Sequence, residues 1–299
     1  MKLKNILLFI LTATIFLSCS EGNRKTTPSG MKYITYKDLN GRKPVAGDWV
    51  TVQMVYMEEN DSVLFDSRDL GKPLRFELPQ SKFEGSFEEG LMLLGEGDSA
   101  SFFISADSMY EHVISKQEGV MKNRPKPGSK LRFNVSLLRV QPYREAEMEI
   151  ALEESKQEQA EKKTLEAYLE EKNIHTEKQP EGYYILMQSP GKGSRVKNGE
   201  TVHVNFTGRF LNGKIFDSNT KSDKPYAFTV GNDEVIKGWD LAVQQLRKGD
   251  KVILIIPSAL AYGSEGIKRG NTLKYYVPPF STLIFDFEVL ETAPLSARK

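Results

Sequence analysis

The sequence predicts an α+β protein made of two copies of one domain, each an antiparallel sheet of five or six strands packed on a short helix. The first observation is length, because 299 residues fit two domains of roughly 100–150 residues each. The second is a repeat: Phe65-Asp66-Ser67 recurs 151 positions later as Phe216-Asp217-Ser218, and Gly97-Asp98 recurs 152 positions later as Gly249-Asp250. The nearly constant offset indicates a duplicated domain. The third is a charged segment that separates the copies.

That charged segment divides the chain. Residues 143–173 contain ten Glu and five Lys or Arg, with no Gly or Pro, and are rich in good helix formers. Their apolar residues form only a thin, interrupted stripe, which favours a solvated spacer helix over a dimerising coiled coil. We therefore place the first copy at residues 30–142, a helical linker at 143–177, the second copy at 178–292 and a tail at 293–299.

Composition excludes several classes of function. Forty-one Lys and Arg balance 40 Asp and Glu, so the net charge of +1 gives no support to a nucleic-acid partner. A single cysteine cannot form an intramolecular disulfide or a cysteine-rich zinc site, and the three histidines are widely spaced. We expect neither a metal nor another cofactor.

Residues 1–18 are typical of a bacterial lipoprotein signal peptide. A basic start precedes an apolar run from Ile6 to Leu17, which is too short for a membrane-spanning helix of about 20 residues. The run ends in Phe16-Leu17-Ser18-Cys19, which resembles a lipobox, although Phe16 stands where Leu is usual. The alternative is an ordinary signal peptide followed by a chance cysteine.

We expect the chain's single cysteine, Cys19, to carry the lipid and residues 19–29 to form a flexible tether. The protein would then be anchored in the bacterial cell envelope, on the periplasmic side or the surface of the outer membrane. The sequence does not choose between these two faces.

The elements of the second copy follow in order. Residues 202–207 alternate apolar and polar, which predicts a half-buried strand, and Asn212-Gly213 predicts a tight hairpin. Asp233 is a candidate cap for a short helix that presents Val235, Trp239, Val243 and Leu246 on one face. Residues 251–256 predict a strand stopped by Pro257. Residues 283–290 alternate strictly, as expected of a final strand.

The order of these residues resembles the FKBP family of peptidyl-prolyl cis-trans isomerases. The resemblance covers about 110 residues. It rests on the following segments: Val202-x-Val204-x-Phe206-Thr207-Gly208, Gly213-Lys214-x-Phe216-Asp217-Ser218, Pro225-Tyr226-x-Phe228, Glu234-Val235-Ile236-x-Gly238-Trp239, Ala261-Tyr262-Gly263, Pro278-Pro279 and Leu283-x-Phe285-Asp286-x-Glu288-x-Leu290. It implies a half-barrel sheet around the helix, with a proline pocket between them.

The resemblance also implies roles for individual residues. Trp239 would form the pocket floor, the Tyr262 hydroxyl and the Ile236 N–H would donate to substrate carbonyls, and Asp217 would be the carboxylate at the rim. The remaining pocket residues would be Phe206, Phe216, Tyr226, Phe228, Val235, Val277 and Phe285, with Phe285 also counted as catalytic. The implied partners are proline-containing polypeptides and FK506-like macrolides.

Two features of the second copy depart from the family. Phe206 replaces the usual Tyr, and the missing hydroxyl removes a partner for Asp217. The segment from Ser264 to Val277, 14 residues long, is roughly six residues longer than in minimal members of the family. One interpretation is that it overhangs the pocket and helps to select the client; the other is a longer solvated hairpin.

The first copy departs further. By sequence offset, Val55 corresponds to Phe206, Leu74 to Tyr226, Glu84 to Ile236 and Phe87 to Trp239, while Phe65, Asp66, Phe76, Tyr110 and Phe133 are retained. These changes predict weak or absent isomerase activity in this copy. For the whole chain we expect an isomerase that assists the folding of exported proteins. The alternative is a lipoprotein that binds polypeptides without turning them over, as a chaperone or scaffold.

Overall fold

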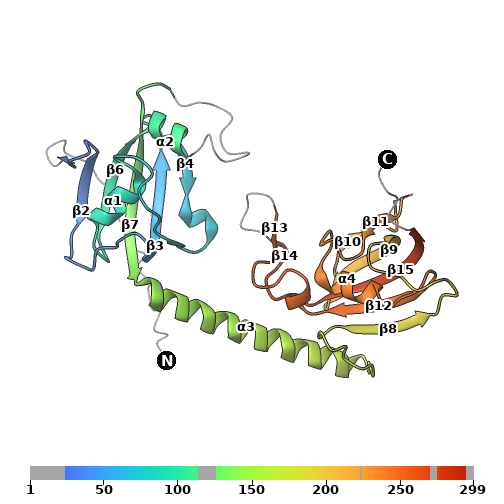
Figure 1. The fold of residues 1–299 in the computed structure, drawn as a ribbon. Coiled ribbons are helices and arrows are strands. Elements are labelled where there is room, and N and C mark those ends of the chain that lie inside the picture. Colours follow the sequence, from blue (N-terminus) through green and yellow to red (C-terminus); the bar gives the residue numbers. More distant parts are fainter. Residues whose placement is uncertain (1–23, 114–125, 223, 270–274, 294–299) are drawn as a thin grey trace, which may run out of the picture. The chain divides into compact units, whose positions relative to one another are not determined.

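The computed structural model describes residues 24–113, 126–222, 224–269 and 275–293 (Figure 1). The chain divides into two compact units, residues 1–147 and residues 148–299. Cys19 and the tail from residue 294 lie outside the described residues. Among the described helices, none has the length and apolar character needed to cross a membrane.

Unit 1 is a seven-stranded antiparallel sheet packed on a short helix. Its strands are β1 (Lys25–Thr26), β2 (Lys32–Lys37), β3 (Trp49–Met57), β4 (Val63–Asp66), β5 (Leu74–Glu77), β6 (Ser99–Ser105) and β7 (Lys130–Gln141). They run in the order β1-β2-β6-β7-β3-β4, and β5 also pairs with β3. The helices are η2 (Ser67–Leu70), α1 (Phe87–Leu93) and α2 (Ala106–His112). The Ser86 hydroxyl caps α1 by accepting from the Glu89 N–H.

Unit 2 repeats this plan with a six-stranded sheet. Its strands are β8 (Tyr184–Ser189), β9 (Thr201–Phe210), β10 (Ile215–Ser218), β11 (Tyr226–Thr229), β12 (Lys251–Ile256) and β15 (Leu283–Ala293). They run in the order β10-β9-β15-β12-β8, with β11 also paired to β9. A separate hairpin joins β13 (Ile267–Lys268) to β14 (Tyr275–Val277), and the helices are α4 (Lys237–Val243) and η4 (Ser258–Leu260). The predicted α+β fold is confirmed.

The predicted helix cap in unit 2 is wrong. Asp233 has a positive φ of 53° and lies in the loop before α4. Ile236 occupies the cap position, and no side chain bonds to the exposed amides there. The helix is also shorter than its apolar pattern indicated, because Val235 precedes it and Leu246 follows it, although both pack on the same core.

The helix α3 (Tyr143–Glu171) differs from the expected solvated spacer. From Met148 onward it belongs to unit 2, and its C-terminal part packs beside β8 and β12 (Figure 1). Leu165 is only 5% exposed and contacts the fully buried Ile255 and Ile284, with Tyr168 and Leu169 at the margin. The thin apolar stripe of α3 is sufficient to hold the helix against unit 2, because it has to cover only one face of the sheet. Strand β12 is therefore buried on both faces, by α4 and by α3.

Strand pairing corrects the correspondence between the two copies. In unit 1, Tyr56 lies opposite Phe133 and Met54 opposite Val135. In unit 2, Gly208 lies opposite Phe285 and Phe206 opposite Phe287. Met54, and not Val55, is therefore the equivalent of Phe206. The offset of 152 holds along this strand and drops to 151 after the hairpin, because the hairpin of unit 1 is one residue longer.

Candidate functional site

A cavity of about 530 Å³ opens between α4 and the concave face of the unit 2 sheet. Its walls and rim are formed by Phe206, Phe216, Asp217, Tyr226, Asp233, Glu234, Val235, Ile236, Lys237, Trp239, Ala261, Tyr262 and Phe285. The structure thus brings together all the site residues expected from the sequence except Phe228 and Val277. We call this cavity the aromatic pocket.

Trp239 forms the floor of the aromatic pocket because it lies in the first turn of α4, on the side that faces the sheet. It is 5% exposed, and its ring lies 4.8 Å from that of Phe206 and 5.0 Å from that of Phe285. Both contacts are edge-to-face, an arrangement that aromatic rings favour. The indole Nε1 is buried without a hydrogen-bond partner among the described residues. The floor is therefore a buried aromatic surface held by ring contacts.

Phe228 and Val277 lie behind the pocket walls. Phe228 is fully buried, with its ring 6.0 Å from that of Trp239. Val277 is buried in the same core. Both residues support pocket residues through packing and do not line the cavity. Sequence position could not separate a wall from the layer behind it, since both fall on the inward face of their strands.

Gly208 allows the walls to close around the cavity. A side chain at this buried position would begin 2.7 Å from Cζ of Phe216 and 2.9 Å from Cε1 of Phe285. Only a residue without Cβ lets these two rings pack over the strand, and they stand 5.8 Å apart at 81°. Phe216 and Phe285 thereby form one corner of the pocket.

Two polar groups of the pocket, Tyr262 and Asp217, act on each other. The Tyr262 hydroxyl and the Asp217 carboxylate both face the pocket, and burial, followed by the charge of Asp217, raises the pKa of Tyr262. Tyr262 therefore stays protonated and can donate a hydrogen bond. At the start of α4, the Ile236 carbonyl accepts from Trp239, while its N–H has no acceptor among the described residues.

Asp217 is oriented locally despite the Phe206 substitution. Its Oδ1 accepts from the N–H of Ser218 at 2.8 Å. The next residue, Asn219, turns into the sheet, where its Oδ1 accepts from the Phe206 N–H at 2.7 Å and its Nδ2 donates to the Val204 carbonyl at 2.9 Å. Asn219 thus fixes the end of β10 next to the carboxylate.

Sequence reasoning did not assign the lining residues Asp233, Glu234, Lys237 and Ala261 to the site, nor Tyr276 to its support. Glu234 holds the loop before α4, since its carboxylate accepts from the Thr229 N–H at 2.9 Å and from the Asn232 side chain at 2.6 Å. The Thr229 amide is the main cause that lowers the pKa of Glu234. Tyr276, on β14, donates its hydroxyl to the Phe216 carbonyl and sets its ring at 90° to that of Phe216. The segment 264–277 therefore contacts the pocket wall, while residues 270–274 lie outside the described residues.

In unit 1 the equivalent place is filled by a side chain. The Tyr56 ring, at the position of Gly208, stacks 5.6 Å from Phe65 and 5.0 Å from Phe133. Burial raises the pKa of this tyrosine. A cavity of about 620 Å³ in this unit lies elsewhere, among Arg24, Glu58, Glu84, Lys130 and Arg132.

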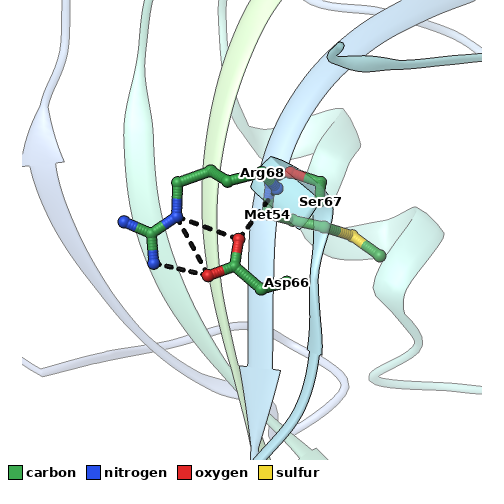
Figure 2. A network of polar contacts seen from close by, with 4 residues as sticks. All are labelled: Met54, Asp66, Ser67 and Arg68. Atoms are coloured by element: carbon green, nitrogen blue, oxygen red, sulfur yellow. Dashed lines mark hydrogen bonds and ion pairs between the residues drawn. The ribbon is translucent and has the colours of Figure 1, made fainter. Parts of the chain in front are cut away.

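Asp66 does not occupy the place of Asp217, although the Phe-Asp-Ser motif is retained. It pairs with Val55, whereas Asp217 pairs with Gly208. Figure 2 shows its carboxylate bound by the Arg68 guanidinium, with Nε at 2.9 Å from both oxygens. These hydrogen bonds hold the pKa of Asp66 below its ordinary range. The Ser67 hydroxyl accepts from the Met54 N–H at 2.9 Å, the role that Asn219 plays for Phe206.

The arrangement in unit 2 offers binding and orientation but no nucleophilic or acid–base pair. Among the described residues that line the aromatic pocket there is no Ser, Cys or His. Within the described residues no group of His, Cys, Asp and Glu side chains could hold a metal ion. The site can enclose a small apolar ring, donate hydrogen bonds to carbonyl oxygens and exclude water.

Comparisons with known proteins agree with this geometry. The model of the FKBP-type peptidyl-prolyl cis-trans isomerase family matches residues 40–138 and 192–290. A probable FKBP-type peptidyl-prolyl cis-trans isomerase of Haemophilus influenzae is 40% identical over 117 residues, which are 39% of this chain and 45% of that protein. The peptidyl-prolyl cis-trans isomerase Fkbp12 of Drosophila melanogaster is 42% identical over 111 residues, 37% of this chain and 97% of that protein.

The match thus spans less than half of the Haemophilus protein and nearly all of the Drosophila protein. Among solved structures, FkpA from Escherichia coli is 31% identical, with a TM-score of 0.41, over 50% of this chain and 65% of that one. The two family matches together cover about two thirds of the chain and fall one in each structural unit. The chain belongs to the FKBP-type peptidyl-prolyl cis-trans isomerase family.

Proposed function

We propose that unit 2 catalyses cis-trans isomerisation of X-Pro peptide bonds in polypeptides. The observation that carries the proposal is the aromatic pocket itself, a cavity with aromatic walls and floor and with polar groups at its edge, among them the Tyr262 phenol, the Asp217 carboxylate and the Ile236 N–H. Its volume suits a pyrrolidine ring and its neighbours, and its chemistry suits a reaction in which no bond to hydrogen is made or broken.

The mechanism follows from the energy barrier to rotation about the X-Pro peptide bond. Rotation about a peptide bond costs roughly 18–20 kcal/mol because resonance is lost. The planar amide is the more polar form, so an apolar pocket that withholds water favours the twisted amide over the planar one. A differential of about 3–5 kcal/mol would accelerate rotation roughly 10²–10⁴-fold. Trp239 and Phe285 supply the apolar surface for this effect.

The polar groups hold the chain around the rotating bond. The protonated Tyr262 hydroxyl and the Ile236 N–H are donors for substrate carbonyls on either side of the proline. Asp217 lies at the rim, where a carboxylate opposes charge on the carbonyl oxygen of the planar amide and so favours its twisted form. FK506-like macrolides are a second ligand class, suggested by relatives named FK506-binding proteins.

Unit 1 has a different role in this proposal. Tyr56 occupies the space a proline ring needs, so we assign no turnover to this unit. It would bind polypeptide or a partner, or position unit 2. A chain that only holds clients, without turnover, remains the competing function and is separated by the experiment below.

We further propose that the protein is a lipid-anchored helper for exported proteins in a bacterial envelope. The support is the sequence of residues 1–19, with its basic start, short apolar run and lone cysteine. Uncatalysed prolyl isomerisation takes tens of seconds or more and can limit folding. The test is labelling with radioactive palmitate in a bacterial host: wild type is labelled and sediments with membranes, and Cys19→Ser is neither labelled nor retained.

Exchange NMR on an Ala-Leu-Pro-Phe peptide tests the isomerase activity. The full chain should accelerate cis-trans exchange, and Phe285→Ala should remove about 90% or more of kcat/KM because it opens the pocket corner. Phe133→Ala is the matched control, since it removes the equivalent ring from unit 1 and should leave activity unchanged. A wild-type chain that suppresses client aggregation without accelerating exchange would establish the holding function instead.

A further inference from the structure

The second half of α3 contacts unit 2 through a polar side chain as well as through its apolar stripe. Glu161 lies one helical turn before Leu165 and on the same face of the helix. Its carboxylate reaches two residues of unit 2, Ser258 and Thr282. A spacer needs no such contact.

Both carboxylate oxygens of Glu161 are engaged. Oε1 accepts from the backbone N–H of Ser258 at 2.8 Å and from the Thr282 hydroxyl at 2.6 Å, and Oε2 accepts from the Ser258 hydroxyl. Ser258 and Thr282 are each 3% exposed. Hydrogen bonds to an ionised group are stronger than neutral ones, and removing the acceptor would leave buried donors unsatisfied.

Ser258 begins the segment that carries Tyr262. Its carbonyl accepts from the N–H groups of Ala261 and Gly263, each at 2.8 Å, so the residues on both sides of Tyr262 are tied to Ser258. The Gly263 carbonyl in turn accepts from the Phe280 N–H at 2.9 Å. Any shift of Ser258 is therefore passed to the phenol at the pocket edge.

Thr282 directly precedes β15, the strand that carries Phe285. Through its two oxygens, Glu161 joins the start of the Tyr262 segment to the start of the Phe285 strand. The first segment carries the Tyr262 hydroxyl, a hydrogen-bond donor of the aromatic pocket. The second carries Phe285, which forms one corner of the pocket. The relative position of the two segments depends on a residue outside the expected boundaries of the second copy, residues 178–292.

We propose that Glu161 is a positioning residue for the aromatic pocket, and that α3 is in this way a working part of the isomerase unit. The inference rests on the proposed isomerase function. It assigns the helix a task that its charged composition does not reveal. Glu161 does not touch substrate; it acts through Ser258 and Thr282.

The experiment compares Glu161→Ala, Glu161→Gln and the matched control Glu158→Ala in the full chain. Glu158 carries the same charge on the same helix and is exposed. Circular dichroism first sets a temperature at which every variant is folded. Exchange NMR then gives kcat and KM on the Ala-Leu-Pro-Phe peptide, and amide spectra report on Ser258, Tyr262 and Gly263.

We expect Glu161→Ala to lose about tenfold in kcat/KM, Glu161→Gln to lose roughly threefold and Glu158→Ala to be unchanged. Gln retains one oxygen that can accept from Ser258 and Thr282, so partial rescue is expected. The amide signals of Ser258, Tyr262 and Gly263 should move in Glu161→Ala and stay in place in Glu158→Ala. A general loss of helix stability would affect both variants alike.

Wild-type activity and unmoved Tyr262 signals in folded Glu161→Ala would overturn the inference. If Glu161→Ala does not fold, Glu161→Gln decides by the same two measurements. If the wild-type chain itself fails to accelerate exchange, the proposed function is wrong, and the amide signals alone still decide whether Glu161 positions the Tyr262 segment.

Discussion

The two units differ most at one position on one strand. Unit 1 has Tyr56, whose ring lies between Phe65 and Phe133. Unit 2 has Gly208, above which Phe216 and Phe285 meet and leave a cavity beside them. The same sheet therefore encloses a filled core in one unit and an open aromatic pocket in the other. One side chain at one strand position can thus decide whether the same fold encloses a cavity.

The two units also differ in the surroundings of the aspartate of the Phe-Asp-Ser motif, which lies in β4 of unit 1 and in β10 of unit 2. Arg68 binds both oxygens of Asp66, and the charge is neutralised at the surface. In unit 2, Asn219 stands at the sequence position of Arg68 and bonds to the backbone instead. Asp217 is then left to face the cavity with Tyr262. The carboxylate of the same sequence motif is thus bound by an arginine in unit 1 and lines the aromatic pocket in unit 2.

The largest expected effect comes from placing the tyrosine of unit 1 into unit 2. Gly208→Tyr should reduce kcat/KM at least about 100-fold, because its side chain starts within 3 Å of Phe216 and Phe285. Gly208→Ala should give an intermediate loss. Exchange NMR measures both, and near-ultraviolet circular dichroism checks the fold. Full activity in folded Gly208→Tyr would contradict the idea that a side chain at this strand position is what makes unit 1 differ from unit 2 in activity.

The next largest effect is expected from a comparison of alanine variants at Asp217 and Asp66. Asp217→Ala should lower kcat/KM about tenfold, because it removes the carboxylate whose charge acts on Tyr262 at the pocket edge. Asp66→Ala should leave activity unchanged, since Asp66 pairs with Arg68 at the surface of unit 1. Peptide exchange rates at a single pH suffice. Equal losses in the two variants would mean that unit 1 contributes to turnover.

The smallest effect is on pH dependence. Burial and the Asp217 charge raise the pKa of Tyr262, so the neutral phenol persists beyond the ordinary tyrosine value of about 10. Activity should be flat from about pH 6 to pH 10 and fall only above that range. Stability from the neutral phenol is likewise complete below the unfolded pKa and is lost as pH rises through the folded pKa.

Tyr262→Phe is the control for this profile. It should have lower activity throughout and lack the alkaline decline, because the titrating hydroxyl is gone. The measurement is the exchange rate of the peptide between pH 6 and pH 11. A wild-type decline centred near neutral pH would point to another essential group.

Much of unit 2 could be predicted from the sequence because its signals are local. Alternation of apolar residues located β9 and β15, and Pro257 located the end of β12. The hairpin at Asn212-Gly213 was also correct, with Gly213 at a φ of 83°. Most expected pocket residues do lie together, since inward positions on a small sheet converge on the single helix they face.

The rest depends on contacts between distant segments. Tyr56 was not recognised, because one extra hairpin residue shifts the offset between the copies and hides its alignment with Gly208. The cap assigned to Asp233 failed because the chain there adopts a positive φ before the helix starts. The role of Glu161 has no local signal, since its donors are 97 and 121 positions away.

Of the two units, we expect only unit 2 to hold an open proline pocket among the described residues. The most direct test is titration of the ¹⁵N-labelled full chain with the Ala-Leu-Pro-Phe peptide, followed by amide spectra. We expect shifts at Phe216, Ile236, Trp239 and Tyr262, and none at Tyr56, Phe65 and Phe133. Saturable shifts at Tyr56 and its neighbours, of similar size and affinity, would contradict this expectation.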